Sequence, residues 1–210
     1  FRLVSVTEPP RVHLTQSREG RFDGIADGTG VAFCESDPKF VAVVGGWDHG
    51  LNGGGGASRD GGKTWEAFEG KGLSWPGFRD SPKLGRIAVG STVQENGVPI
   101  LVWIPRFNAP RYSLDWGKTW TQSKGAPGGM TPSEWDPWQT LAADPVDGKT
   151  FYALSNNLEK DGAASIYKSS DGGANWTRAG EIKGSWKERT WAEHHIRTMP
   201  GKSGVLWVSL

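Results

Sequence analysis

Four short runs of apolar, β-branched and aromatic residues recur along the chain, and clusters of turn-forming residues separate them. The runs begin at Lys39, Pro99, Thr150 and Val205 and read KFVAVVGG, PILVWIP, TFYALSNN and VLWVSL. Residues of these types favour β-strands, and short strands divided by Gly, Pro, Asn and Asp are typical of small antiparallel sheets. The pattern therefore predicts an all-β protein with four short strands in each repeating unit.

Three octapeptides repeat in the intervals between these runs. They occupy residues 58–65, 113–120 and 169–176 and read SRDGGKTW, SLDWGKTW and SSDGGANW. Their acidic residues, Asp60, Asp115 and Asp171, are 55 and 56 residues apart, and the closing tryptophans keep the same intervals. This regular spacing indicates a structural repeat of about 55 residues.

The octapeptide has the chemistry of a β-hairpin tip and is the motif called an Asp-box. An Asp side chain accepts hydrogen bonds from main-chain amides of its own turn, and a glycine two positions later readily adopts a positive φ. The closing tryptophan is expected to pack back under the turn. We therefore interpret the three box aspartates as structural residues and not as catalysts or metal ligands.

Asp-boxes are typical of β-propellers, so we expect four-stranded antiparallel blades. Residues 1–210 then form a single partial propeller domain of about 3.8 blades. Such an array is expected to leave an open edge that is covered by the remainder of the same protein or by a second propeller chain.

Composition and charge narrow the class of protein further. The chain has 24 Lys and Arg against 23 Asp and Glu, so it lacks the basic surface that nucleic-acid or acidic-membrane binding requires. Cys34 is the only cysteine, and its apolar surroundings predict a buried thiol. No stretch is long and apolar enough to cross a membrane. Twelve Trp and 31 Gly support an all-β fold rich in aromatic surface and tight turns.

Several segments resemble the second propeller of glycoside hydrolase family 74. They are GTGVAFCESDPKFVAVVGG from Gly28, ASRDGGKTWEAF from Ala57, GRIAVGS from Gly85, DPVDGKTFYALSNN from Asp144 and MPGKSGVLWVSL from Met199. The resemblance implies a seven-bladed propeller that faces a second one across a cleft. It further implies a secreted enzyme that hydrolyses β-1,4-glucan backbones such as xyloglucan with inversion, and a polysaccharide as the binding partner.

The resemblance also bears on catalysis. The family takes one catalytic aspartate from each propeller, and that of the second propeller lies in a Gly-Asp-x-x-Gly-Phe segment. Phe1 falls where the Phe of that segment would be. Both catalytic carboxylates are therefore expected before residue 1, and the isolated chain is expected to be inactive.

The residues themselves offer candidates for substrate binding. An inverting glycosidase needs two carboxyl groups about 6.5 to 9.5 Å apart. The carboxylates that could reach a cleft are Asp23, Asp27, Asp48, Asp80, Asp136 and Glu193. Among these, Asp48 ranks first as a candidate catalytic carboxylate within the chain, because it lies in a long Gly-rich loop between two strands, GGWDHGLNGGGG. Sugars stack on tryptophan, and Trp47, Trp135, Asp136 and Trp138 are the predicted substrate-binding residues.

Two further functions remain open at this stage. One is a non-catalytic Asp-box propeller that binds glycan or protein. The other is a sialidase, which needs three convergent arginines and a tyrosine nucleophile. Its candidate arginines are Arg2, Arg11, Arg21, Arg79, Arg106 and Arg111, and its candidate nucleophiles are Tyr112, Tyr152 and Tyr167. No metal site is predicted, because neighbours such as His194 and His195 point to opposite faces of a strand, and no cofactor is expected.

Overall fold

The computed structural model describes residues 28–45, 54–68, 85–105, 109–126, 140–155, 164–182 and 195–209. Within these ranges the regular secondary structure consists of β-strands, which form three four-stranded sheets and one two-stranded hairpin. Neighbouring strands in each sheet are consecutive in the chain and antiparallel. The predicted all-β class with four-stranded antiparallel blades is confirmed. The described part of the chain has no helix with the length and apolar character needed to cross a membrane.

The first two blades have the same strand order. The first blade consists of β1 (Gly28–Phe33), β2 (Val41–Gly45), β3 (Gly54–Ser58) and β4 (Glu66–Ala67). The second consists of β5 (Gly85–Val93), β6 (Pro99–Pro105), β7 (Arg111–Ser113) and β8 (Thr121–Gln122). The outer strands β4 and β8 are two residues long and exposed, whereas β6 is buried along its whole length. A strand buried on both faces is expected to be continuously apolar, as PILVWIP is.

The third blade repeats this order and is followed by a hairpin. The third blade contains β9 (Leu141–Ala143), β10 (Phe151–Ser155), β11 (Ala164–Ser169) and β12 (Thr177–Ile182). The hairpin is formed by β13 (His195–Thr198) and β14 (Leu206–Ser209). The four apolar runs of the sequence correspond to β2, β6, β10 and β14, the second strand of each unit.

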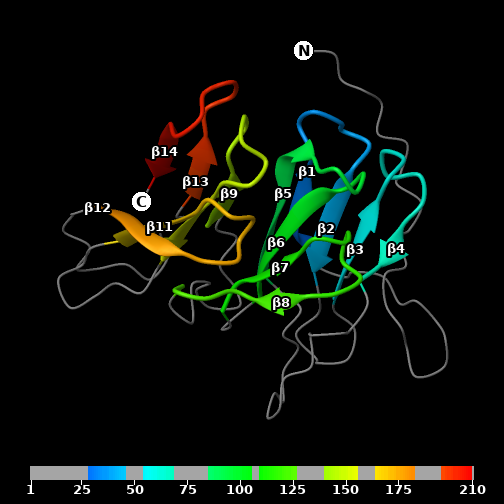
Figure 1. Ribbon diagram of the computed structural model, residues 1–210, viewed down its shortest axis with the longest axis horizontal. Helices are drawn as coiled ribbons and strands as arrows, with labels where there is room; N and C mark the ends of the chain where they lie inside the picture. Colours follow the sequence, from blue (N-terminus) through cyan, green and yellow to red (C-terminus); the bar gives the residue numbers. More distant parts are fainter. Residues whose placement is uncertain are drawn as a thin grey trace, which may run out of the picture.

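The hydrophobic core lies between blades that are stacked face to face. Side chains of β1 to β3 pack against Ile87, Leu101 and Trp103 of the second blade. Its opposite face, which includes Ile104, packs against the third blade. That blade in turn packs against Ile196 of the hairpin. This stacking is the packing of a propeller, and Figure 1 shows the first blade and the β13–β14 hairpin at opposite sides of the array.

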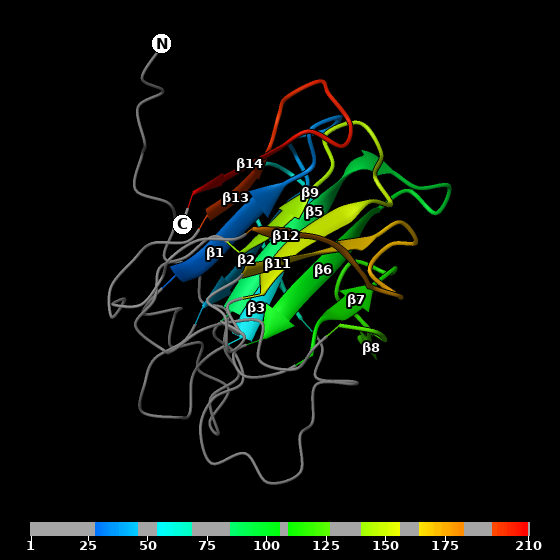
Figure 2. The ribbon, with the colours of Figure 1, turned by 90° about the vertical axis from the view of Figure 1, so that its left-hand side faces the viewer.

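The first strands of successive units are neighbours in space. β1 contacts β5, β5 contacts β9, and β9 contacts β13. Figure 2 shows the strands of successive sheets stacked as layers. Each first strand has a free edge, because it is the end strand of its four-stranded sheet or of the hairpin. These four strands therefore hold the position that the inner strands of a propeller hold around its axis.

The two ends of the strands define two faces of the array. The turns between first and second strands, residues 34–40, 94–98, 144–150 and 199–205, lie together at one end, which we call the turn face. A hydrogen bond from the amide of Ser36 to the carbonyl of Ser91 joins the first of these turns to β5 of the next blade. The opposite end, which we call the long-connection face, holds the strand ends that flank residues 46–53, 69–84, 106–110, 127–140, 156–163 and 183–194.

Candidate functional site

The Asp-box hairpins are three copies of one hydrogen-bond network. Asp60 Oδ1 accepts bonds from the Ser58 hydroxyl at 2.8 Å and the Thr64 amide at 2.9 Å. Its Oδ2 accepts a bond from the Thr64 hydroxyl at 2.6 Å. The indole of Trp65 donates to the carbonyl of Gly62 at 3.0 Å. The predicted turn chemistry, in which the Asp accepts bonds from its own turn and the Trp closes it, is confirmed for this box.

The other two boxes repeat these contacts. Asp115 accepts the equivalent bonds from Ser113 and from the amide and hydroxyl of Thr119. Asp171 accepts them from Ser169 and from the amide and side chain of Asn175, which takes the place of the threonine. Every box carboxylate is therefore fully engaged in its own hairpin, which supports its interpretation as a structural residue.

The hydrogen bonds in the boxes shift the acidity of the three carboxylates in one direction. Bonds from the side chain and amide of Thr64 hold the pKa of Asp60 well below its ordinary value of 3.8. Burial acts to raise the pKa of Asp115, but bonds from Thr119 and Ser113 outweigh it and the pKa is lowered. The same balance lowers the pKa of Asp171. A general acid at neutral pH needs a raised pKa, so none of the three has the acidity of a proton donor.

A fourth aspartate, Asp144, is completely buried at the turn face. Its Oδ1 accepts bonds from the amides of Val146 and Asp147, both at 2.9 Å. Its Oδ2 accepts bonds from the Tyr152 hydroxyl at 3.1 Å and from the Ser203 hydroxyl and the Gly204 amide at 2.9 Å. These last two groups belong to the β13–β14 turn. Asp144 therefore joins the third blade to the hairpin.

This contact also determines the acidity of Asp144 and Tyr152. Burial acts to raise the pKa of Asp144, but the amides of Asp147, Val146 and Gly204 outweigh it, so the pKa is lowered. Burial and the Asp144 carboxylate raise the pKa of Tyr152 from 10.0 to about 12. An activated tyrosine nucleophile requires the opposite shift. The other two candidate nucleophiles, Tyr112 and Tyr167, lie in β7 and β11.

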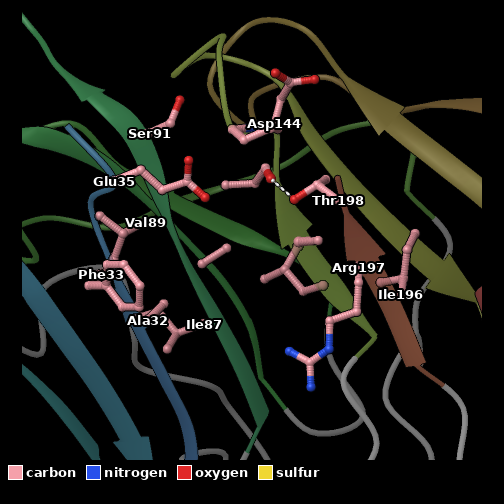
Figure 3. A pocket seen from close by; sticks show the side chains of 15 residues that line it. Ala32, Phe33, Glu35, Ile87, Val89, Ser91, Asp144, Ile196, Arg197 and Thr198 are labelled. Atoms are coloured by element: carbon pink, nitrogen blue, oxygen red, sulfur yellow. Dashed lines mark hydrogen bonds between the residues drawn. The ribbon is translucent and has the colours of Figure 1, made fainter. Parts of the chain in front are cut away.

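A cavity of about 200 Å³ lies along the first strands of the four units. Figure 3 shows Phe33 on one side of it and Arg197 on the other, with Glu35 near the turn face. Its two carboxyl groups are those of Glu35 and Asp144. Because the Asp144 carboxylate is occupied by five hydrogen bonds, the described residues that line this cavity do not offer the pair of carboxyls that inverting hydrolysis needs.

The predicted substrate-binding residues lie outside the described residues. They are Trp47, Trp135, Asp136 and Trp138. Asp48, the first-ranked candidate carboxylate, and the other candidates Asp23, Asp27, Asp80 and Glu193 are also outside. The strand ends that flank residues 46–53 are Gly45 and Gly54, and both lie at the long-connection face. β9, which follows residues 127–139, begins at the same face.

Two buried arginines lie at this face in the second blade. Arg86 and Arg111 are 6% and 8% exposed, and Arg86 donates to the carbonyl of Gly85 at 2.9 Å. Burial lowers the pKa of Arg111. Among the arginines considered for a sialidase clamp, Arg111 lies within the described ranges and begins β7. In the described residues, no group of three or more His, Cys, Asp or Glu side chains is placed to hold a metal ion.

Sequence reasoning missed two features of the site region. The burial of Asp144 could not be predicted, because its partners Ser203 and Gly204 lie 59 and 60 residues away. Trp207 belongs to the apolar run VLWVSL, which favours burial, yet it is 64% exposed, because no described strand covers its side of the hairpin. The prediction for Cys34 is confirmed, since the side chain is fully buried.

Comparison with known proteins finds curated relatives by sequence and solved structures by fold. The chain is 26% identical over 186 residues to xyloglucanase Xgh74A of Acetivibrio thermocellus, covering 88% of this chain and 18% of that protein. It is 29% identical over 162 residues to a probable oligoxyloglucan-reducing end-specific xyloglucanase of Neosartorya fischeri, covering 73% of this chain and 18% of that protein. The chain thus spans about a fifth of the length of these curated relatives. No protein-family model matches it.

Two solved structures share the fold. The family 74 xyloglucanase of Xanthomonas campestris superposes with a TM-score of 0.59 and 22% identity, covering 91% of this chain and 25% of that one. The family 74 enzyme of Niastella koreensis superposes with the same TM-score and 20% identity, covering 92% and 24%. The sequence and structure neighbours of this chain are glycoside hydrolase family 74 enzymes, as the resemblance of its motifs predicted.

Proposed function

We propose that this chain is a segment of a glycoside hydrolase that cleaves xyloglucan or a related β-1,4-glucan with inversion. The observation that carries the proposal is the similarity to named xyloglucanases over most of the chain, in sequence and in fold. Such a polymer is too large to cross a membrane, so an enzyme that cleaves it works outside the cell. Secretion is therefore part of the proposal.

We further propose that the long-connection face is the substrate side. The segments that contain Trp47, Asp48 and the Trp135 to Trp138 group leave and re-enter the sheets at strand ends on this face. On the turn face, the boxes and Asp144 use their carboxylates to hold turns together. A glucan needs aromatic platforms edged by free hydrogen-bonding groups, and the sequence concentrates such residues next to the long-connection face.

Catalysis and binding should separate in this chain. The carboxylates of the boxes and of Asp144 are held by structural hydrogen bonds, so none of these four is available as a catalytic acid or base. The 210-residue chain should therefore bind xyloglucan oligosaccharides without cleaving them. A parent protein that binds but does not hydrolyse would favour the non-catalytic propeller instead.

Calorimetry with xyloglucan oligosaccharides tests the binding side. The double variant Trp135→Ala with Trp138→Ala should lose roughly 1 to 3 kcal/mol of binding free energy, as expected when aromatic surface no longer stacks on the sugar. Trp207→Ala is the matched control, because this tryptophan is exposed but lies in β14 of the hairpin and not in the proposed sugar platform. An unchanged affinity of the folded double variant would show that the pair does not form the platform.

A reducing-sugar assay tests the catalytic side. The chain alone should release no detectable product from xyloglucan, while the complete protein should cleave it. Cleavage by the isolated chain at the rate of the complete protein would place the catalytic carboxyls within the 210 residues. Asp48→Asn would then be the first variant to assay.

A further inference from the structure

The strand β5 is irregular where it borders the cavity along the first strands. Its regular pairing with β6 breaks after Val89 and resumes at Val93, which leaves residues 90–92 opposite a single residue of β6. In contrast, β9 and β13 pair with their second strands without a shift in register. Such a bulge bends a strand and changes the direction of its side chains, and bulges are common next to functional sites. Here the bulge places Ser91 on the wall of the cavity.

Contacts with two neighbouring turns hold the bulge in place. The carbonyl of Ser91 accepts a hydrogen bond at 3.0 Å from the amide of Ser36, in the turn of the first blade. On the other side, Gly90 lies so close to the turn of the third blade that a side chain on it would meet the carbonyl of Gly148. A side chain on Gly148 would in turn meet Thr92. The backbone at Ser91 is therefore fixed from both sides, as a preformed binding site requires.

The Ser91 hydroxyl has no hydrogen-bond partner among the described residues, although Ser91 is only 3% exposed. The box serines and Ser123 are also buried, and all of them bond through their hydroxyls. A buried hydroxyl without a partner costs free energy, and such a group in a native fold calls for a bound molecule or a functional role. Ser91 therefore indicates that the cavity holds a molecule with a hydrogen-bonding group.

The buried part of the cavity wall suits a neutral molecule. Ile87 and Leu141 line it with aliphatic side chains that are at most 1% exposed. The buried carboxylate of Asp144 is already occupied by five hydrogen bonds. A charged ligand would lose its hydration here without gaining a counter-charge, which is costly.

The remaining polar groups of the wall suit a ligand with several hydroxyls. Glu35 and Arg197 are exposed, and Figure 3 shows Glu35 near Ser91 and the guanidinium of Arg197 well away from both. A carboxylate accepts hydrogen bonds, a guanidinium donates them, and a hydroxyl does both. The Thr198 hydroxyl donates to the carbonyl of Ala143 at 2.9 Å, so its oxygen can still accept. Sugar hydroxyls donate and accept, and they match this mixed set.

The volume of the cavity sets the size of the ligand. An apolar cavity of about 150 Å³ is enough to hold a benzene molecule. The cavity here has a volume of about 200 Å³. It therefore admits one six-membered ring with its hydroxyls, but not a chain of such rings.

We propose that the cavity bordered by β1, β5, β9 and β13 is a monosaccharide site, in which the Ser91 hydroxyl bonds to a hydroxyl of glucose or xylose in the pyranose form. The choice of these two sugars rests on the proposed function, because they are units of xyloglucan. Ser91 lies at the end of β5 next to the turn face. The site is therefore distinct from the proposed sugar platform, which flanks the long-connection face.

An NMR titration of the 210-residue chain with glucose and with xylose tests the proposal. The backbone amide signals of residues 87–91 and 141–144 should shift, with a dissociation constant of about 1 to 10 mM for so small a ligand. The zwitterion γ-aminobutyrate is the control ligand. It should bind at least about tenfold more weakly, because the buried wall offers it no counter-charge.

Two substitutions of Ser91 test the role of its hydroxyl. Ser91→Ala should weaken sugar binding about fivefold, because one hydrogen bond is lost. It should not lower the free energy of unfolding, because this hydroxyl has no partner among the described residues. Ser91→Val should abolish binding, because its larger side chain also takes up space in the cavity.

Ser123→Ala is the matched control variant. Its hydroxyl is also buried, but it donates to the carbonyl of Gly173 and does not line the cavity. This variant should lose stability and keep the sugar affinity of the parent. Ser91→Ala and Ser123→Ala should therefore have opposite effects on binding and on stability.

Three outcomes would overturn the monosaccharide site. They are unshifted amides at sugar concentrations well above the expected dissociation constant, parental affinity in Ser91→Ala, and tighter binding of γ-aminobutyrate than of either sugar. The proposed function fails separately, if the complete protein does not cleave xyloglucan. A blank titration with a complete protein that cleaves xyloglucan would overturn the cavity site alone.

Discussion

The Asp115 carboxylate holds both ends of its hairpin turn through bonds to Ser113 and Thr119. Asp115→Ala removes the acceptor and leaves these donors without their partner. A hydrogen bond to a charged group contributes a net of about 1.5 to 3 kcal/mol, but the exposed Thr119 donors can bond to water instead, so we expect a loss of about 2 kcal/mol in the free energy of unfolding. Chemical denaturation of the purified variant measures this loss.

Asp37→Ala is the matched control for this prediction. Asp37 also accepts a bond from a main-chain amide, that of Lys39, but it does so in an exposed turn at 3.2 Å. Its loss should cost less than about 1 kcal/mol. If the two variants lost the same free energy of unfolding, the box network would stabilise the protein no more than an ordinary exposed turn does.

Trp116 is a site where packing opposes backbone preference. It has a φ of 61°, whereas the equivalent positions of the other two boxes are glycines, Gly61 and Gly172, at 76° and 78°. Trp116 is 2% exposed and packs edge-on against Phe40 with ring centroids 5.1 Å apart. The left-handed conformation costs roughly 1 kcal/mol for a non-glycine residue, and removing a buried tryptophan costs about 3 to 5 kcal/mol.

Trp116→Gly should therefore destabilise the protein by about 2 to 4 kcal/mol, because the packing loss exceeds the strain that is relieved. Thermal and denaturant unfolding measure this difference. Gly61→Ala, at the equivalent position of the first box where no atom lies within 4 Å, should cost about 1 kcal/mol from backbone strain alone. A Trp116→Gly variant as stable as the parent would mean that the contact with Phe40 contributes nothing.

At the scale of elements, the contact from Asp144 fixes the hairpin to the third blade. The β13–β14 unit has two strands, and its apolar contacts with the third blade centre on Ile196, Leu206 and Val208. Asp144→Ala removes the acceptor of the Val146, Asp147 and Gly204 amides and of the buried Tyr152 hydroxyl. Because an unsatisfied buried group costs about 1 to 3 kcal/mol, the hairpin should open far more often than the rest of the chain.

Hydrogen exchange resolved by peptide checks this prediction. Amides of residues 195–209 should exchange faster in Asp144→Ala, while those of 85–105 should change little. Tyr152→Phe, which removes one of the five donors to Asp144, should produce a smaller effect of the same kind. A uniform increase over all blades would show that Asp144 stabilises the whole fold and not this junction.

The elements also show what the sequence could and could not predict. The second strand of each blade was visible as an apolar run because it is buried between two neighbours, as β6 is. The outer strands β4 and β8 gave no such signal, because each is two exposed residues held by a neighbouring strand and a box. The boxes were recognised because their bonds are local in sequence, whereas the bonds that Asp144 accepts from the hairpin turn cross 59 and 60 residues. The predicted sugar platform at Trp135 and Trp138 stays a prediction.

At the scale of the whole molecule, the shifted groups define a stability plateau in pH. Asp60, Asp115, Asp144 and Asp171 all have a pKa lowered from 3.8 by their hydrogen bonds. The unfolded chain therefore binds protons before the folded one as the pH falls. Their contribution to stability is complete above the unfolded pKa and is lost as the pH falls below about 4 towards the folded values.

Tyr152 sets the alkaline limit in the opposite sense. Its pKa is raised from 10.0 to about 12, so the unfolded chain releases this proton first as the pH rises. Stability from Tyr152 is therefore complete below pH 10 and declines towards pH 12. Denaturant titrations from pH 2 to 12 should show a plateau between these limits. Tyr152→Phe should lower the plateau and flatten its alkaline side. An unchanged slope in Tyr152→Phe would exclude Tyr152 as its source.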